Sequence, residues 1–154
     1  MGSKPIQQES ELFKRYKNNP VLTPSMWPYK VNSVFNAGAT IYEGKVLLLV
    51  RIEDMRGFSH LCRAESSDGY SNWKIDEVPT LQPKPEDFPE EIYGIEDPRI
   101  VKLEDEGKYA VVYTSFSESG PLVSLATTED FKSFRRFGVV MTPDDKDASL
   151  FPRK

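Results

Sequence analysis

Short apolar runs separated by turn residues recur along the chain and predict β-strands. The clearest case lies between residues 90 and 117, where two apolar runs flank the charged turn from Glu104 to Lys108. Two runs of strand length joined by a polar turn are typical of an antiparallel hairpin. The adjacent carboxylates Glu96 and Asp97 stand where this hairpin begins, so the pattern predicts acids at its mouth.

The same pattern occurs a second time, which is the strongest sequence evidence on the fold. The aligned segments, in chain order, are residues 36–43 with 97–104, 44–45 with 107–108, 46–50 with 109–113, 61–64 with 123–126, and Asp68 with Asp130. Each copy predicts three strands, an Asp turn and a short final strand. The repeating unit is therefore a four-stranded sheet of about 60 residues.

Four-stranded units in series are characteristic of β-propellers, in which each sheet covers an apolar face of its neighbour. We therefore predict an all-β propeller over residues 19–154, with blades at about 31–76 and about 92–140 and a third beginning near residue 146. About two and a half blades leave one apolar face uncovered. The chain is thus expected either to belong to a longer protein or to associate, for example as a homo-oligomer.

The first 18 residues form an N-terminal extension in this scheme. Leu12, Phe13 and Tyr16 recur at helical spacing and predict a short helix over residues 9–17. The extension is polar and charged, and the longest aliphatic run, residues 46–50, is too short to span a bilayer. We expect a cytoplasmic protein with no membrane partner.

Composition narrows the functional classes. An apolar fraction of 38% and 12 prolines suit short strands joined by many turns. The net charge of -4 argues against a nucleic-acid partner, because such partners require clustered Lys and Arg. Cys62 is the single cysteine and His60 the single histidine, so neither an intrachain disulfide nor a cysteine-cluster metal site is expected. No metal and no cofactor are predicted.

The step from Asp97 to Arg99 is the strongest candidate for chemistry. Pro98 disfavours helical conformations of the preceding residue, which predicts an extended Asp97 with a fixed side-chain direction. Alternation along a strand then places Arg99 on the same side as Asp97 and Glu96 on the other side. A plain Asp-Pro turn with a surface arginine would show the same residues, and this interpretation stays open.

Three polar residues occupy equivalent positions at the starts of successive units: Asn36, Asp97 and Asp147. The innermost strands of a propeller surround a central channel, so these side chains are expected to converge at one end of it. The alternative is that each of them bonds to the backbone at its own strand start. The proline-rich segment 78–91 between the two copies is expected to border the same mouth.

Four motifs in order resemble glycoside hydrolase family 130: FNAGA at 35–39, LLVR at 48–51, GIEDPR at 94–99 and KDASLFP at 146–152. From about residue 19 onward, the chain resembles the N-terminal portion of these five-bladed β-propeller enzymes. The family cleaves β-mannosides, mostly by inverting phosphorolysis and in some branches by hydrolysis. The resemblance implies a β-mannoside oligosaccharide as substrate and, for a phosphorylase, inorganic phosphate as co-substrate and mannose 1-phosphate as product.

The resemblance also implies roles for individual residues. Asp97 matches the family's general acid, which protonates the leaving oxygen through a hydroxyl of the bound mannose while phosphate or water attacks the opposite face. The expected substrate-binding residues are Asn36, Arg51, Tyr93, Glu96, Arg99 and Asp147, and the expected phosphate-binding residue is Lys146.

The family's other phosphate ligands, and the base of its hydrolytic branches, lie in later blades. The isolated chain is therefore expected to be incomplete for activity. Phosphorolysis, hydrolysis and non-catalytic sugar binding remain alternatives.

Overall fold

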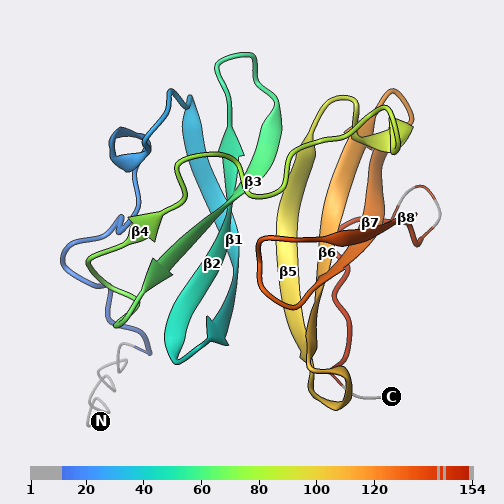
Figure 1. Cartoon of the computed structure of the whole chain (residues 1–154). Coiled ribbons are helices and arrows are strands. Elements are labelled where there is room, and N and C mark those ends of the chain that lie inside the picture. The colour runs from blue at the N-terminus through green and yellow to red at the C-terminus, as the bar shows by residue number, and fades with distance from the viewer. Residues whose placement is uncertain (1–11, 142, 144, 153–154) are drawn as a thin grey trace, which may run out of the picture.

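Two four-stranded antiparallel sheets make up the computed structural model, which describes residues 12–141, 143 and 145–152. The first sheet contains β1 (Ser33–Tyr42), β2 (Lys45–Glu53), β3 (Ser59–Ser66) and β4 (Lys74–Ile75), in that order. The second contains β5 (Ile95–Leu103), β6 (Lys108–Ser117), β7 (Gly120–Thr128) and β8 (Arg135–Val139), also in sequence order. Figure 1 shows the sheets side by side, with the connection from β4 to β5 crossing from one to the other. The predicted all-β architecture is confirmed.

Three short 3-10 helices lie in the connections: η1 (Pro24–Met26), η2 (Pro89–Glu91) and η3 (Glu104–Glu106). The helix η2 ends the proline-rich connection just before β5, and η3 forms the charged turn of the predicted hairpin. In the part of the chain that the structure describes, no helix is long and apolar enough to cross a membrane.

The hydrogen-bond register repeats between the sheets and confirms the internal repeat. Gly38 of β1 pairs with Leu49 of β2, and the aligned residues Arg99 and Val112 pair in the second sheet. Both first strands also carry an irregularity near their start, between Val34 and Ala37 in β1 and between Glu96 and Arg99 in β5. The two copies therefore share their irregularities as well as their strands.

The Asp turns repeat in the same way. Asp68 Oδ1 accepts hydrogen bonds from the amides of Tyr70 and Ser71, and Asp130 Oδ1 accepts the corresponding bonds from Lys132 and Ser133. These bonds favour the ionised carboxylate, so the backbone amides lower the pKa of both aspartates below its usual range.

The core consists of two layers because β2 is buried on both faces. Leu47 and Leu49 point toward the second sheet and pack with Tyr109, Val111 and Phe131. The alternate positions of β2 point the other way, where Trp27 from the segment before β1 completes a cluster with Val50, Ile52, Cys62 and Ala64. Burial on both faces explains why residues 46–50 are uniformly apolar.

The segments at the two ends of the described chain contain no regular element. Residues 12–17 form no helix, so the predicted helix is wrong for this part of its range, and residues 9–11 of that prediction lie outside the described residues. Residues 145–152, where a third blade is expected to begin, form no strand, and the third blade stays a prediction. A strand is stabilised by hydrogen bonds to a partner strand, and this segment has no strand paired with it among the described residues.

A glycine lets the two sheets approach closely. A Cβ atom at Gly38 would lie 2.9 Å from the carbonyl oxygen of Pro98 and 2.9 Å from Cγ1 of Ile100. We expect Gly38→Ala to lower the free energy of unfolding by about 1–3 kcal/mol, because the strands must separate to admit the methyl group. Urea unfolding tests this. The control Ala39→Ser changes an exposed neighbour and should have an effect within about 0.5 kcal/mol.

The Asp turns predict a specific loss of stability in acid. The folded state lowers the pKa of Asp68 and Asp130 below the ordinary value of 3.8. The stability that these two carboxylates give the folded state is therefore present above pH 3.8 and is lost as the pH falls below that value. The double variant Asp68→Asn/Asp130→Asn should be less stable than the parent at pH 7, and the two melting temperatures should converge toward pH 2. A difference that stays constant from pH 7 to pH 2 would contradict this explanation.

Candidate active site

A bulge near the start of β5 positions the two acids. The pairing with β6 shifts between Glu96 and Arg99, and Asp97 has a φ of 49°, in the left-handed region. The expectation of an extended Asp97 is therefore wrong. Aspartate enters the left-handed region more readily than most residues, which makes this conformation accessible there. The expectation that Glu96 points away from Asp97 is also wrong, because the bulge interrupts the strand's alternation.

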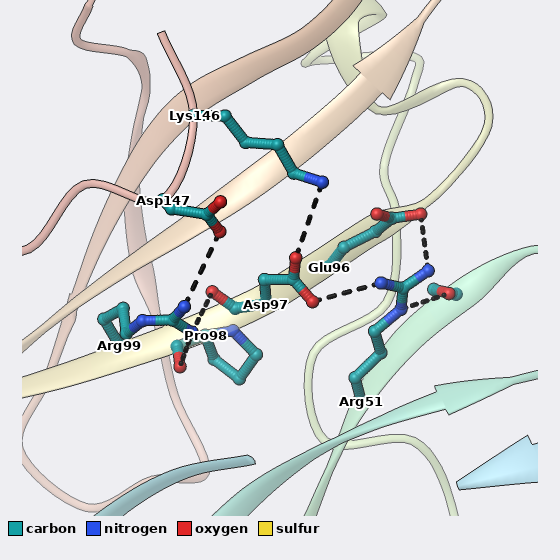
Figure 2. A network of polar contacts seen from close by, with 8 residues as sticks. Arg51, Glu96, Asp97, Pro98, Arg99, Lys146 and Asp147 are labelled. Carbon is teal, nitrogen blue, oxygen red and sulfur yellow. Dashed lines mark hydrogen bonds and ion pairs between the residues drawn. The ribbon is translucent and has the colours of Figure 1, made fainter. Parts of the chain in front are cut away.

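One arginine of the first sheet binds both acids of the second. Arg51 on β2 donates from Nη1 to Oδ1 of Asp97 at 3.0 Å, and its Nη2 lies 2.9 Å from Oε1 of Glu96 (Figure 2). Its Nε donates to Oγ of Ser59 at 3.0 Å. All three nitrogens of the guanidinium thus have partners. The side chains of Arg51, Glu96 and Asp97 are 17%, 18% and 13% exposed, so water screens these contacts only in part.

The segment after β8 returns to the same acid. Lys146 Nζ lies 3.7 Å from Oδ2 of Asp97, the carboxylate oxygen that Arg51 does not bind, and Arg99 Nη2 lies 3.6 Å from Oδ1 of Asp147 (Figure 2). Lys146 and the pair Arg99–Asp147 are more exposed than the acid itself. Asp97 therefore lies between two cations supplied by different parts of the chain.

Ser59, which sequence reasoning missed, links the sheets beneath this network. A Cβ atom at Gly94 would lie 2.8 Å from the amide nitrogen of Ser59, and Gly94 has a φ of 121°. Only glycine permits this approach and this conformation together. Ser59 begins β3 with no distinguishing neighbours in the sequence, so no sequence signal could have found it.

One aromatic ring contacts the polar network, and a group of three more includes the neighbours in sequence of Ser59 and Gly94. The Arg51 guanidinium lies over the ring of Phe35, 4.7 Å from its centroid. Tyr93 lies between Phe58 and Phe116, with centroid distances of 6.1 and 6.0 Å. The Tyr93 hydroxyl donates to Glu118, whose negative charge raises the pKa of the phenol. Exposed ring faces beside hydrogen-bonding groups are suited to a sugar, which has both C–H and hydroxyl surfaces.

A pocket of about 410 Å³ adjoins this site, and Ser59 contributes to its wall. Pro79, Pro83 and Pro85 of the proline-rich connection line it, together with Phe58 and His60. Asp97 does not line this pocket, and the expected place of this connection beside the substrate mouth stays a prediction. Inside the pocket, His60 Nε2 lies 2.9 Å from the Tyr29 hydroxyl, and burial lowers the pKa of His60.

The remaining candidates are placed as follows. Asn36 lies exposed in the bulge of β1, and the structure gives it no hydrogen bond to the network among the described residues. Cys62 is buried in the core. No group of three or more His, Cys, Asp or Glu suited to a metal ion occurs in the described ranges 12–141, 143 and 145–152.

The arrangement can hold polar ligands at a fixed carboxyl group. Glu96, Arg51, Asp97 and Lys146 alternate in charge along one chain of ion pairs. The separate pair Arg99–Asp147 adjoins it, because Arg99 Nη1 donates to the backbone carbonyl oxygen of Asp97 at 3.4 Å. Hydroxyl groups can accept from the guanidinium and ammonium donors and donate to the carboxylates. A carboxyl group fixed in this way can transfer a proton to a bound ligand.

Comparisons with known proteins identify the family of the chain. A family model for glycoside hydrolase family 130, described as beta-1,4-mannooligosaccharide phosphorylase, matches residues 7–154. The 1,2-beta-oligomannan phosphorylase of Thermoanaerobacter sp. (strain X514) is 34% identical over 152 residues, which cover 92% of this chain and 49% of that protein.

Solved structures show the same similarity. The beta-1,2-mannobiose phosphorylase from Listeria innocua, in complex with beta-1,2-mannobiose, has a TM-score of 0.78 and 26% identity over 91% of this chain and 54% of that one. A putative glycoside hydrolase from Parabacteroides distasonis has a TM-score of 0.72 and 32% identity over 82% of this chain and 42% of that one. These similarities confirm the predicted propeller fold for the part that the chain covers. The chain spans about half the length of the curated relatives it matches.

The network predicts unequal effects for two arginines. Arg51→Gln leaves Glu96 and Asp97 adjacent without the guanidinium, so we expect the free energy of unfolding to fall by about 1.5–3 kcal/mol, the range for hydrogen bonds to charged groups. The matched control is Arg56→Gln, since Arg56 is 74% exposed and pairs only with nearby Asp54 in the described structure. Its loss should cost at most about 1 kcal/mol. Equal costs in urea unfolding would contradict the central role of Arg51.

Proposed function

The chain belongs to glycoside hydrolase family 130, and on this premise we propose that it carries the acid side of the active site of an inverting β-mannoside phosphorylase. The observation that supports this most directly is the position of Asp97, held between Arg51 and Lys146 at the bulge of β5. The matched relatives are named as phosphorylases of β-linked mannosides, including 1,2-beta-oligomannan and beta-1,4-mannooligosaccharide phosphorylases.

In the proposed reaction Asp97 is the general acid. Its proton moves to the leaving glycosidic oxygen through a hydroxyl of the bound mannose, the route that the family implies. Arg51 fixes the carboxyl from one side and, with Glu96, is close enough to hold sugar hydroxyls. Tyr93 and Asn36 are the further sugar contacts of the proposal. The bond from the anomeric carbon to the leaving oxygen breaks while a phosphate oxygen forms a new bond on the opposite face, which gives mannose 1-phosphate.

Lys146 is the proposed phosphate contact in this chain. Its ammonium group is a compact charge that attracts phosphate without the bidentate geometry of arginine. Lys146 is only partly buried, as a group that meets an incoming anion must be. Arg99 and Asp147 form an ion pair next to Asp97 and Lys146. These two residues complete the proposed substrate-binding set. Because the relatives are about twice as long as the chain, further ligands from other blades belong to the proposal.

The substrate in this proposal is a β-mannoside oligosaccharide, with inorganic phosphate as co-substrate and no other cofactor. The related phosphorylases differ in linkage, being named for β-1,2 and β-1,4 mannosides, so the linkage stays open. A cytoplasmic location, where phosphate is plentiful, is part of the proposal. Hydrolysis is the alternative. One solved relative, 29% identical to this chain, carries a description that says the family contains glycoside hydrolases that target β-1,2 mannosidic linkages.

The test compares Asp97→Asn with its parent on β-1,2- and β-1,4-mannobiose, with and without phosphate. The assay uses the chain alone and a complete propeller that contains it. Mannose 1-phosphate that forms only with phosphate supports phosphorolysis, whereas free mannose identifies a hydrolase. Asp97→Asn should lower kcat by about 100- to 10,000-fold and leave KM within a few-fold, because it removes the proton donor and keeps the shape.

The matched control is Asp105→Asn, an exposed acid in the η3 turn, which should keep the parent's rate. If the complete propeller binds mannobiose and yields no product with Asp97 intact, the chain belongs to a sugar-binding protein and the enzymatic proposal is wrong.

A further inference from the structure

Glu91, at the end of η2, has a completely buried carboxylate. Its Oε1 accepts a hydrogen bond from the Tyr113 hydroxyl at 2.8 Å, and its Oε2 accepts one from the amide of Lys84 at 2.8 Å. Arg136 forms an ion pair with the same Oε2, and its side chain is only 11% exposed. A buried carboxylate without such partners would be strongly unfavourable, so these groups require one another.

These contacts join three separate segments. Tyr113 belongs to β6, Arg136 to β8 and Lys84 to the proline-rich connection, where Arg136 also donates to the carbonyl oxygen of Gln82. Burial of the Tyr113 phenol and, after it, the charge of Glu91 raise the pKa of Tyr113, so this phenol stays protonated as a donor. Glu91 thus fixes η2 to the second sheet immediately before β5 begins.

A short path leads from Glu91 to the proposed acid. The Glu91 carbonyl oxygen accepts from the Gly94 amide at 2.9 Å, and the Gly94 carbonyl oxygen accepts from the Phe116 amide at 3.0 Å. Gly94 in turn touches the backbone of Ser59, whose hydroxyl accepts from Arg51 Nε. The position of η2 therefore affects the start of β5. Through Ser59 it also affects the position of Arg51, the arginine that binds Asp97.

We propose that Glu91 is a positioning residue for the active site, which sets the distance between Asp97 and Arg51 by anchoring η2 and Gly94. The inference rests on the proposed function for its catalytic consequence, while its structural part stands on the contacts alone. An error of about 1 Å in the placement of catalytic groups can cost 100-fold in rate. A carboxylate in the core, without contact to substrate, can therefore control turnover.

The experiment uses Glu91→Gln, which keeps the shape and one acceptor but removes the charge that binds Arg136. The matched control is Glu86→Gln in the same connection, where the side chain is exposed. In the chain alone, nuclear magnetic resonance follows the Arg51 Nε–Hε signal and the amides of Ser59 and Gly94. We expect all three signals to shift in Glu91→Gln and to stay at their parent positions in Glu86→Gln.

In the complete propeller, assayed at a temperature where the variant is fully folded, Glu91→Gln should lower kcat by about 10- to 100-fold with KM within about twofold. A purely structural role would lower the melting temperature and leave the Arg51 and Gly94 signals and kcat unchanged, which would overturn the proposal. If Glu91→Gln does not fold, Tyr113→Phe removes one hydrogen bond and keeps the ion pair. It should shift the same signals by less, and unchanged signals would equally overturn the proposal.

Failure of the two proposals can be told apart. If the parent propeller forms no product, the proposed function fails, and the signals of Arg51, Ser59 and Gly94 still decide whether Glu91 positions them. If the parent turns over and Glu91→Gln matches it in kcat with unshifted signals, only the positioning role is wrong.

Discussion

The candidate site depends on a single guanidinium that crosses from one sheet to the other. Arg51 leaves the first sheet and holds Glu96 and Asp97 of the second, while Ser59 and the ring of Phe35 keep it in place. Two neighbouring carboxylates repel each other, and an opposite charge between them removes most of that cost. Because these groups are only partly exposed, water screens their attraction less than it screens the attraction of a surface ion pair.

The backbone around this arginine is unusual for reasons that the contact explains. Asp97 adopts a left-handed φ directly before a proline, a conformation that surrounding interactions must stabilise. Its Oδ1 reaches Arg51 and its Oδ2 reaches Lys146, so the bulge turns both carboxylate oxygens toward cations. If Asp97 were extended and the strand alternated regularly, the side chains of Glu96 and Asp97 would point to opposite faces of the sheet. The local strain therefore brings two acids to the same arginine.

The sequence predicts those parts of the fold that local patterns encode. Alternation, glycine turns and Asp turns act over a few residues, so the strands and their repeated register follow from them. Two separate motifs, at 48–51 and 94–99, indicated Arg51 and Asp97, the two residues that meet. The side of Glu96, the role of Ser59 and the burial of Glu91 arise from contacts between distant segments. Glu91 looks like one more acid in an acidic, proline-rich stretch, and only the positions of Tyr113 and Arg136 distinguish it.

The repeat also explains why the site forms between the sheets. Each first strand has a bulge near its start, at positions that overlap in the aligned copies, and a bulge redirects the side chains that it contains. The bulge of β1 places Phe35 beside the Arg51 guanidinium, and the bulge of β5 places Asp97 at its Nη1. One irregularity, repeated, thus supplies two different groups to one cation. The equivalent position is Asn36 in the first copy and Asp97 in the second, so only the second of these two sheets places a carboxyl group there.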